Sequence, residues 1–370
     1  LDAIIDGGLH DHLQGGFFRY CIDREWIIPH FEKMLYDQAM LLWVYSWAYM
    51  VLKEENYADT VRSILKCLDE TFLIDGLYLS AHDADTLHVE GATYTWKYSE
   101  LMTLLEPDEM NYMKENYFIA GDGNFNGKNH LVRRRHDVRG RIEDILLDAR
   151  KQRPQPFADR KIITSWNAFT GIGLVMAWRA LGDSDLLEKA ESLLDRLIEK
   201  HMQGNVLSHS SLDGVLQNNE FLEDAASVLL FATYVHEENN NREETIRFLA
   251  EHINGFYDCE WFESCNRDFR KVPAPELDHP LPSSFSTVTM ALLRKSILMN
   301  EEYDLNGKGK GTGHEFHDLA IFMTVGHWHI IHTPRRINWQ ELSLNTVQVH
   351  DETFHDCFEG VCRLDRVTDK

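Results

Sequence analysis

The feature that most constrains the fold is an alternation between helical segments that are apolar nearly all round and segments that are apolar on one face only. Residues 36–52 are almost continuously apolar. The next segment places apolar side chains at helical spacing on one face: Tyr57, Val61, Ile64, Leu65, Leu68 and Phe72. A helix that is apolar on every side must be buried, whereas a helix with one apolar stripe can cover it. The pattern therefore predicts an inner and an outer layer of helices.

The same pair of segments recurs along the chain. An all-apolar segment is followed by a striped one at 166–181 and 186–198, at 222–235 and 246–253, and at 285–298 and 316–322. Weaker helical patterns cover 98–117 and 141–152, so the total approaches about twelve helices. A glycine that starts an extended apolar stretch follows the outer segments, as at Gly76, Gly204 and Gly255. Such repeats form either an open solenoid or a closed ring.

The C-terminal region departs from this pattern. After about residue 328 the segments become short and mixed, and 339–351 is predicted to be strand or irregular packing. No strong linker interrupts the helical periodicity, so one domain is expected over residues 1–370.

Composition argues against several classes of protein. The chain has 60 acidic and 37 basic residues and a formal net charge of -23, which repels nucleic acid and anionic lipid. Its longest apolar run, 39–52, is shorter than the roughly 20 residues that span a bilayer. Six scattered cysteines without a C-x-x-C pair favour a reducing compartment, so a cytoplasmic location is expected. The start at Leu1, without a signal sequence, suggests that an upstream part is missing.

The densest group of polar residues opens the first all-apolar helix, in the segment GGFFRYCIDREWIIPHFEKMLYD at 15–37. Pro29 is expected to set the helix start. The helix would then carry polar side chains on two neighbouring faces, with His30, Lys33 and Asp37 on one and Glu32 and Tyr36 on the other. The preceding loop adds Arg19, Tyr20, Asp23 and Trp26. Capping and surface ion pairs are the competing explanation, but the position before a buried helix favours a pocket floor.

Two further groups occupy similar places. Asp83 and Asp85, with Trp96 downstream, can face the same way in an extended loop and bind a hydroxyl, a cation or water, although turn capping explains them equally well. Two later inner helices begin with polar pairs, Trp166–Asn167 and Glu223–Asp224. In a closed ring these junctions would meet around one cavity and supply general acid and base groups. Helix capping is the alternative for Glu223 and Asp224.

Three other patterns carry weaker hypotheses. His314, His317, His327, His329 and His332 suggest zinc, but no cysteine or carboxylate lies at a recognised offset, so no metal is expected. Cys21 lies in the dense loop but has no sign of activation as a nucleophile. The basic run at 133–135 is expected to be a solvated loop.

Residues 15–38, with the run GGFFRYCIDREWIIPHFEKMLYDQ, resemble the signature of the YyaL / spermatogenesis-associated protein 20 family. Other family-like pieces follow in order: Ser80–Asp85 with Glu90-Gly91 and Tyr94-x-Trp96, Gly123-Asn124, DRKIITSWN at 159–167, and Leu222-Glu223-Asp224. The resemblance covers about residues 1–300. This sequence departs from the family pattern at four places: Phe18 replaces His, His82 replaces Glu, Ala168 replaces Gly, and Ala225 replaces Tyr.

The resemblance implies an all-α fold, an (α/α)6 barrel of helical hairpins like that of six-hairpin glycosidases, with short extended loops at its mouth. It also implies a relationship in shape to N-acylglucosamine and cellobiose 2-epimerases and to glycoside hydrolases. A thioredoxin-like domain would lie upstream, in a part that is absent from this chain. The resemblance supplies no reaction, because the activity of the family is unsettled.

Two classes of function remain at the level of sequence. The first is a carbohydrate-active isomerase, epimerase or hydrolase with a sugar bound at the barrel mouth. The second is a module that binds a ligand or a redox partner without turnover. The expected catalytic residues are His30, Glu32, Lys33, Asp37, Asp83, Asp85, Glu223 and Asp224. The expected substrate-binding residues are Arg19, Tyr20, Asp23, Trp26, Tyr36, Trp96, Trp166 and Asn167. A small carbohydrate ligand is expected, and no cofactor, nucleic acid or membrane partner.

Overall fold

The structure is a computed structural model of the 370-residue chain. It describes all residues except 135–139, 218, 265–270, 302–315, 317, 320–327, 359–360 and 364–370. The chain divides into two compact units. Unit 1 consists of Leu1–Tyr45 and Glu54–Lys161, and unit 2 of Ser46–Lys53 and Ile162–Lys370. The single domain expected over 1–370 stays a prediction.

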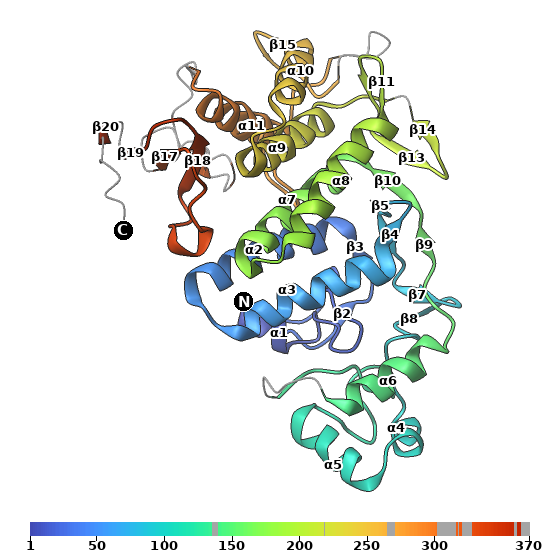
Figure 1. The fold of residues 1–370 in the computed structure, drawn as a ribbon. Helices are drawn as coiled ribbons and strands as arrows, with labels where there is room; N and C mark the ends of the chain where they lie inside the picture. The colour runs from blue at the N-terminus through green and yellow to red at the C-terminus, as the bar shows by residue number, and fades with distance from the viewer. Residues whose placement is uncertain are drawn as a thin grey trace. The chain divides into compact units, whose positions relative to one another are not determined.

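Unit 2 contains the helical hairpins that the apolar pattern predicts (Figure 1). Its inner helices α7 (Thr164–Leu181), α9 (Leu222–Asn239) and α11 (Ser284–Leu298) are buried on nearly every side. The outer helices α8 (Ser184–His201) and α10 (Glu243–Ile253) each bury one stripe. α9 packs against α7, α10 and α11, and α7 packs against α8. The two kinds of helix are therefore confirmed in this unit.

The turn between α7 and α8 shows how sequence ends one helix and starts the next. Gly182 has a φ of 73°, a left-handed conformation that costs glycine little, and its N–H donates to the carbonyl of Trp178. The Asp183 side chain then accepts from the N–H of Asp185 and caps α8. Gly182 therefore ends α7, and Asp183 starts α8.

Unit 1 begins with a short helix and continues with longer helices that carry its core. They are α1 (Asp2–Asp6), α2 (Leu35–Leu52, whose last residues belong to unit 2), α3 (Glu55–Cys67) with a π-helical end at Leu68–Phe72, α4 (Tyr98–Leu104), α5 (Pro107–Asn116) and α6 (Arg141–Lys151). The helical pattern over 98–117 is split, because Pro107 lacks an N–H and fits only the first turn of a new helix. Trp96, Leu101, Met113 and Leu146 pack together in the core of this region.

Short β-hairpins follow the outer helices, where the glycine marks predict extended chain. The pairs are β4 (Leu73–Ile74) with β5 (Leu77–Tyr78) after α3, β11 (Met202–Gln203) with β12 (Val206–Leu207) after α8, and β15 (Tyr257–Asp258) with β16 (Glu260–Trp261) after α10. A short 3-10 turn, Asn254–Phe256, precedes β15. Gly76 and Gly204 have positive φ values of 78° and 61° and make the first two turns. The repeat of helix, helix and hairpin is thereby confirmed.

A backbone hydrogen bond ties each hairpin repeat together. The first residue of an inner helix donates its N–H to a carbonyl in the extended chain that follows the next outer helix: Leu35 to Ser80, Thr164 to His209, and Leu222 to Glu263, at 2.9 Å each. The N–H groups of a first helical turn have no partner inside the helix, so these bonds satisfy one of them. Consequently, the residues around Ser80, His209 and Glu263 are fixed beside helix starts.

The remaining short strands build loops around these helix starts. Unit 1 has β1 (Tyr20–Cys21) with β2 (Pro29–His30), the three-stranded sheet β3 (Lys33–Met34), β6 (Ala81–His82) and β9 (Ala158–Asp159), and the hairpin β7 (Asp85–Thr86) with β8 (Val89–Glu90). A second three-stranded sheet contains β10 (Lys161–Ile163), β13 (Ser210–Leu212) and β14 (Val215–Gln217). These are the short extended loops that the sequence predicts.

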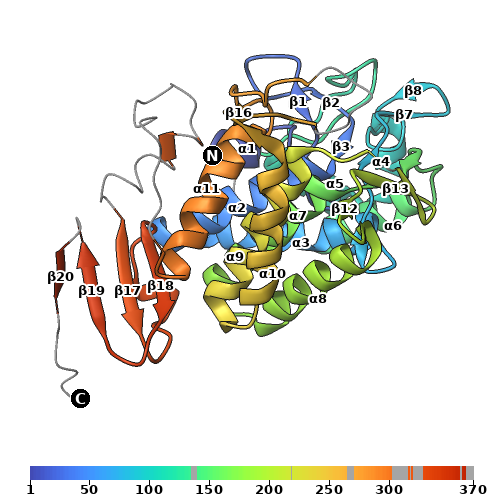
Figure 2. The same ribbon diagram turned by 90° about the horizontal axis from the view of Figure 1, so that it is seen from above.

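A four-stranded sheet closes the described chain, where the sequence indicates only short mixed segments. Its strands are β17 (His329–Thr333), β18 (Thr346–His350), β19 (His355–Phe358) and β20 (Val361–Arg363). They lie side by side in the order β18, β17, β19, β20 (Figure 2), and β17 pairs in parallel with β18. A 3-10 turn, Trp339–Glu341, precedes β18. Thus 339–351 is partly strand, as predicted, and the sheet adds to the helical fold.

One prediction about the dense segment is wrong. α2 begins at Leu35 and not at Pro29, because 29–30 and 33–34 are extended and pair with β1 and β6. His30 and Lys33 therefore do not share a helix face with Asp37. These residues are extended because their backbone N–H and C=O groups pair with neighbouring strands. The helical spacing of their side chains does not reveal this pairing.

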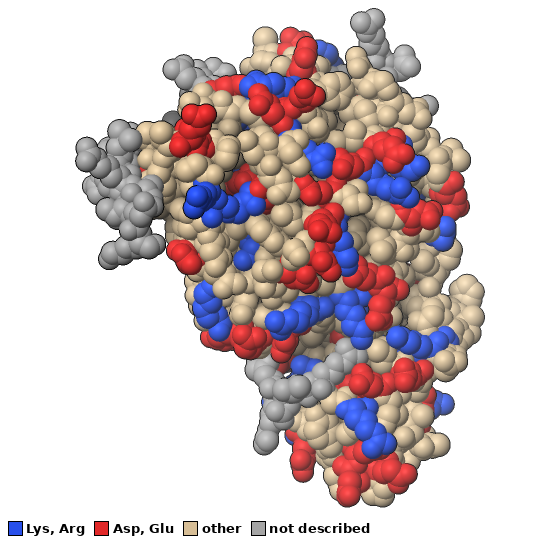
Figure 3. All heavy atoms as spheres, viewed as in Figure 1, with Lys and Arg blue, Asp and Glu red and all other residues tan. Residues whose placement is uncertain are grey.

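The surface and the described helices agree with the composition argument. On the face shown in Figure 3, the described basic side chains are scattered among acidic ones, unlike the basic patch of a nucleic-acid-binding protein. Among the described residues, no helix is long and apolar enough to cross a membrane. His314, His317 and His327 of the zinc hypothesis lie outside the described residues, while His329 and His332 form ion pairs with Asp356 and Asp351.

Candidate functional site

A group of ionisable side chains in unit 2 lies at the start of α9. Glu223 and Asp224 occupy the first turn of this helix, where the positive end of the helix dipole favours carboxylates. His209 precedes β13, and Glu263 follows β16. The carbonyls of His209 and Glu263 bond to the starts of α7 and α9, which brings both side chains to this place. We call these four residues the His209 cluster.

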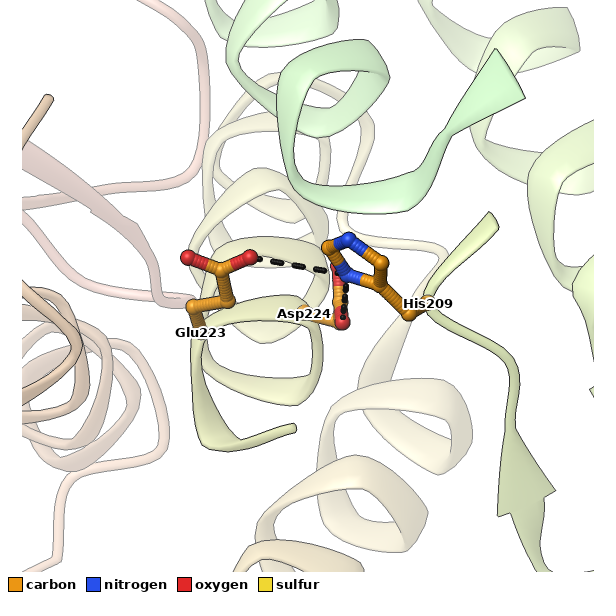
Figure 4. A group of neighbouring side chains, drawn as sticks. All are labelled: His209, Glu223 and Asp224. Atoms are coloured by element: carbon orange, nitrogen blue, oxygen red, sulfur yellow. Dashed lines mark hydrogen bonds and ion pairs between the residues drawn. The ribbon is translucent and has the colours of Figure 1, made fainter. Parts of the chain in front are cut away.

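The contacts within the His209 cluster are short and directional. His209 Nδ1 lies 2.8 Å from Asp224 Oδ2 and 3.5 Å from Glu223 Oε1 (Figure 4). Asp224 Oδ1 also accepts the N–H of Ser165 at 3.0 Å, and Glu263 Oε1 accepts the N–H of Glu223 at 3.2 Å. The Asp224 side chain is fully buried, whereas those of His209 and Glu223 are 29% and 41% exposed. Asp224 thus orients the imidazole, and the two exposed groups face outward.

The electrostatics of the cluster favour proton transfer near neutral pH. Burial raises the pKa of Glu223 to about 7, and the negative charge of Asp224 adds to the shift, while His209 opposes it. Burial also raises the pKa of Asp224 despite its hydrogen bond from His209. For His209, burial lowers the pKa, but the bond to Asp224 and the nearby carboxylates outweigh it and leave the pKa raised. Because Asp224 accepts from Nδ1, Nε2 is left to meet a ligand.

The same side chains have the chemistry of a cation site. One ligand atom from each of His209, Glu223 and Asp224 lies within 4.8 Å of the others. Imidazole nitrogen and carboxylate oxygen are ligands that zinc and similar divalent ions accept. A metal would displace the proton shared by His209 and Asp224, so cation binding and proton transfer by this pair exclude each other.

The predicted binding residues at the start of α7 lie beside this cluster in different environments. Trp166 is half-buried, whereas Asn167 is fully buried and its amide donates to the carbonyl of Ile163 at 3.0 Å. Ser165, in the first turn of α7, donates its backbone N–H to Asp224 Oδ1. Trp166 therefore keeps a surface that can contact a ligand, while Asn167 stabilises the first turn of α7.

In unit 1, the dense segment forms a half-exposed group of its own. Arg19 bonds through Nη1 to Glu32 at 2.9 Å and through Nε to the Tyr36 hydroxyl at 3.0 Å. His30 Nδ1 lies 2.8 Å from Glu90 Oε1, and its ring stacks on Tyr20 with centroids 5.2 Å apart. These contacts involve five of the predicted residues, which come from β1, β2, the start of α2 and the residues that flank the two strands.

Asp37 lies next to this group in the first turn of α2. Burial raises the pKa of Asp37 to about 7, with Arg19 opposing and Glu32 adding to the shift. Its Oδ2 atom is buried and accepts no hydrogen bond. A carboxylic acid that keeps its proton near neutral pH can serve as a general acid, so Asp37 remains a predicted catalytic residue.

Lys33 is placed differently from the prediction. Its side chain is 2% exposed, and its ammonium donates to Asp11 Oδ2 at 2.8 Å and to the carbonyl of Gly15 at 2.9 Å. Burial lowers the pKa of Lys33, but Asp11 outweighs it and leaves the pKa raised. Lys33 therefore stays protonated at neutral pH and does not act as a base.

Four further predicted residues hold the chain in shape. Asp23 accepts the N–H groups of Ile27 and Ile28 at 2.9 and 2.7 Å, and Asp83 accepts the N–H of Asp85 at 3.2 Å, as expected for turn capping. Trp26 has a positive φ of 59° in the same turn. Trp96 is fully buried in the core with the Arg153 guanidinium 3.7 Å from its ring, so a sugar contact would require this core to open. The Asp85 side chain is exposed in β7.

The structure joins some predicted residues and leaves one prediction open. His30, Glu32 and Asp37 belong to unit 1, whereas Glu223 and Asp224 belong to unit 2. Their convergence at one barrel mouth stays a prediction. His209 and Glu263 are new members that the sequence pattern alone did not identify. The repeat offers a signal for His209, since Leu207-Ser208 follows Gly204 at the same spacing as Leu79-Ser80 follows Gly76.

Comparison with known proteins supports the resemblance seen in residues 15–38. No family model matches the chain. Spermatogenesis-associated protein 20 of the mouse is 33% identical over 244 residues, covering 55% of this chain and 31% of that protein. The human protein is 30% identical over 244 residues with the same coverage, and an uncharacterized protein of Caenorhabditis elegans is 32% identical over 246. The chain is a homologue of spermatogenesis-associated protein 20. The match spans about a third of the length of these relatives.

Solved structures with similar folds are sugar-processing enzymes. Cellobiose 2-epimerase of Spirochaeta thermophila aligns with a TM-score of 0.50 at 12% identity, covering 79% of this chain and 59% of that enzyme. The cellobiose 2-epimerase of Bacillus thermoamylovorans gives 0.50 at 12% identity, with 87% and 69% covered. A heparin-specific unsaturated glucuronyl hydrolase gives 0.45 at 11% identity, with 79% and 66% covered. The chain has the six-hairpin (α/α) fold that the family resemblance implies.

Proposed function

We propose that the chain is a carbohydrate-active enzyme of the isomerase or epimerase type, which moves protons on a sugar at the His209 cluster. The observation that carries this proposal is the buried Asp224, which bonds to His209 Nδ1 beside a half-exposed Glu223. A carboxylate that fixes the tautomer of an imidazole is how proteins prepare a base, and the neighbouring acid has a pKa of about 7. The fold of two cellobiose 2-epimerases supports the class of substrate.

In this proposal the three side chains have separate roles. His209 Nε2 takes the proton from the carbon next to the sugar carbonyl, and Glu223 gives its proton to the oxygen on which charge develops. Asp224 is a positioning residue, because its full burial keeps it from the substrate. Trp166 supplies a ring against which a sugar can pack. Tautomerisation of the resulting enediol and return of both protons restore the enzyme and leave an isomerised sugar.

Hydrolysis is less well supported by the same geometry. A retaining or inverting glycosidase needs two carboxyl groups that both reach the sugar. In the His209 cluster only the Glu223 carboxyl is well exposed, because Asp224 is buried and Glu263 is held by the backbone of Glu223. A ligand-binding module without turnover is the alternative that the experiment must separate from an enzyme.

The test is proton exchange in deuterated water with a panel of aldoses, N-acyl sugars and disaccharides. We expect deuterium at the carbon next to the carbonyl, and we expect His209→Gln to lower the rate by about 100-fold or more with little change in KM. His350→Gln, an exposed histidine at the end of β18, is the matched control and should leave the rate unchanged.

Two results would contradict the proposal. If no sugar exchanges or turns over while a sugar still raises the melting temperature, the chain is a binding module. If a sugar reacts and His209→Gln reacts as fast as the unaltered chain, the chemistry lies elsewhere, and the group around Asp37 in unit 1 becomes the candidate.

A further inference from the structure

Unit 1 contains a cavity of about 500 Å³ that the proposed reaction does not use. Two of its lining residues, Pro156 and Ala158, are apolar, and the others carry polar side chains. Those that matter for the argument are Lys33, His82, Tyr94 and Lys151, together with one lining carboxylate, Glu70, which pairs with Lys151. A pocket of this size that is lined mainly by polar groups suits a small hydrophilic molecule rather than an apolar one.

The sheet β3–β6–β9 provides one wall of this cavity. Lys33 lies opposite His82 across β3 and β6, and His82 lies opposite Ala158 across β6 and β9. Residues that are directly opposite one another in neighbouring strands point to the same face of a sheet. The three side chains therefore form a row that faces the cavity, and the small Ala158 leaves room at its end.

Positive charge is in excess behind this wall. Asp11 is fully buried and accepts Lys33 Nζ at 2.8 Å on Oδ2 and Arg150 Nη1 at 2.7 Å on Oδ1. Its Oδ1 also accepts the N–H groups of Leu13 and Gln14. Both cations are buried with it, at 2% and 4% side-chain exposure. One carboxylate thus neutralises one of two buried cations, and an uncompensated buried charge is costly unless a counter-charge binds.

Neutral hydrogen-bonding groups line the same cavity. Burial raises the pKa of Tyr94 to about 12, so its hydroxyl keeps its proton at neutral pH. Tyr94 is 4% exposed, and its hydroxyl makes no hydrogen bond to the described residues. Burial lowers the pKa of His82 to about 4, so this ring is neutral, and its Nε2 bonds to the carbonyl of Thr71 at 2.9 Å. Tyr94 lines the cavity, so its neutral hydroxyl can donate to a bound acceptor.

We propose that this cavity binds the anionic group of a small hydrophilic molecule, a carboxylate or a phosphate. Lys33 has used two of its three N–H donors, and the third, with the Tyr94 hydroxyl, meets the anion. Lys151, held only loosely by Glu70 at 3.6 Å, supplies a second cation at the rim. The proposal is independent of the reaction at the His209 cluster.

The test measures binding to the full chain by calorimetry and thermal shift with four probes: inorganic phosphate, glucose 6-phosphate, gluconate and glucose. We expect the anionic probes to bind and to raise the melting temperature through this cavity, whereas glucose, an aldose that the His209 cluster can bind, should bind independently of Tyr94 and Lys151. A preference for glucose 6-phosphate or for gluconate identifies the anion as phosphate or carboxylate. Binding of none of the anionic probes would overturn the proposal.

Two variants place the binding in this cavity. Tyr94→Phe removes a hydroxyl that has no partner and should fold normally, while affinity for the anionic probes falls about five- to ten-fold. Lys151→Gln should weaken them by a similar factor, and Lys200→Gln, at an exposed site on α8, is its matched control. Unchanged affinity in both cavity variants would exclude this site. His209→Gln should bind the probes normally, so a failed reaction and a failed pocket give different results.

Discussion

At the scale of single residues, two carboxyl groups keep a proton near neutral pH for a shared reason. Asp37 in unit 1 and Glu223 in unit 2 are both desolvated, and in both a cation opposes the shift without cancelling it. Arg19 is already engaged by Glu32 and Tyr36, and His209 by Asp224. A cation that is shared in this way stabilises each carboxylate less than a dedicated partner would.

The pKa of Glu223 predicts the pH dependence of the proposed reaction. Because the acid form of Glu223 is active and its pKa is about 7, the rate should fall about tenfold per unit above pH 7. The rate should also fall on the acid side, because His209, whose pKa is raised, gains a proton there and no longer acts as a base. Glu223→Gln should lower kcat by about 100-fold and remove this alkaline limb, as measured by exchange rates from pH 5 to 9. An alkaline limb that persists in the variant would belong to another group.

Asp37 predicts a pH dependence of stability instead. Its pKa is about 7 in the folded chain, against 3.8 for an ordinary aspartate, so the folded chain holds this proton more tightly than the unfolded chain does. Stability contributed by Asp37 is therefore full below pH 3.8 and is lost as pH rises to about 7. We compare the unfolding free energies of Asp37→Asn and the unaltered chain by urea denaturation at pH 5 and pH 8. From pH 5 to pH 8, the unaltered chain should lose about 1–2 kcal/mol more than Asp37→Asn does. If the unfolding free energies of the two proteins change with pH in parallel, Asp37 has an ordinary pKa.

At the same scale, two residues of the His209 cluster could be predicted from the sequence. It identified Glu223 and Asp224 from their position before a buried helix, and this position holds in the structure. It did not identify His209, which lies 14 residues earlier in an extended segment with no apolar period around it. Its contact with Asp224 depends on a backbone bond from Thr164 to the His209 carbonyl, and such non-local pairing leaves no local pattern.

At the scale of elements, close packing between α7 and α9 depends on one glycine. A Cβ atom at Gly171 would lie 2.0 Å from the ring of Phe231, which is fully buried in α9. Gly171→Ala should therefore lower the unfolding free energy by about 1–3 kcal/mol, although alanine favours a helix by about 1 kcal/mol. Gly255→Ala, where a Cβ meets nothing within 4 Å, is the control and should change stability little. Urea midpoints would show this difference, and a stabilised Gly171→Ala would contradict it.

The elements also show where apolar periodicity is informative. It located the helices of unit 2 within a few residues, because buried and striped helices differ in how many of their faces are apolar. It misplaced the start of α2, because 29–34 form strands whose pairing is set by distant residues such as His82. It also left β17 and β19 unassigned, since these short strands alternate weakly and pair across many residues.

At the scale of the whole molecule, unit 2 is held together by a buried ion network centred on Glu237 of α9. Its carboxylate bonds to Arg179 of α7 at 2.8 Å, to Arg294 of α11, and to the N–H of Gln348 in β18 at 2.9 Å. Burial raises the pKa of Glu237, but the two arginines outweigh it and leave the pKa lowered. One side chain thus connects the inner helices α7, α9 and α11 with the C-terminal sheet.

Removing this charge should reveal whether the two units unfold together. Glu237→Gln keeps the shape but leaves Arg294 without its buried counter-charge and Arg179 with Glu238 alone, which costs about 3–5 kcal/mol. Because the partners of Glu237 named above all belong to unit 2, we expect hydrogen exchange to accelerate in α7, α9, α11 and β18 while α3 and α6 keep their protection. Glu199→Gln, an exposed glutamate of α8, is the control. Equal acceleration in α3 and α6 would mean that the chain unfolds as a single cooperative domain. In that case, a stability loss caused in unit 2 lowers the hydrogen-exchange protection of every helix.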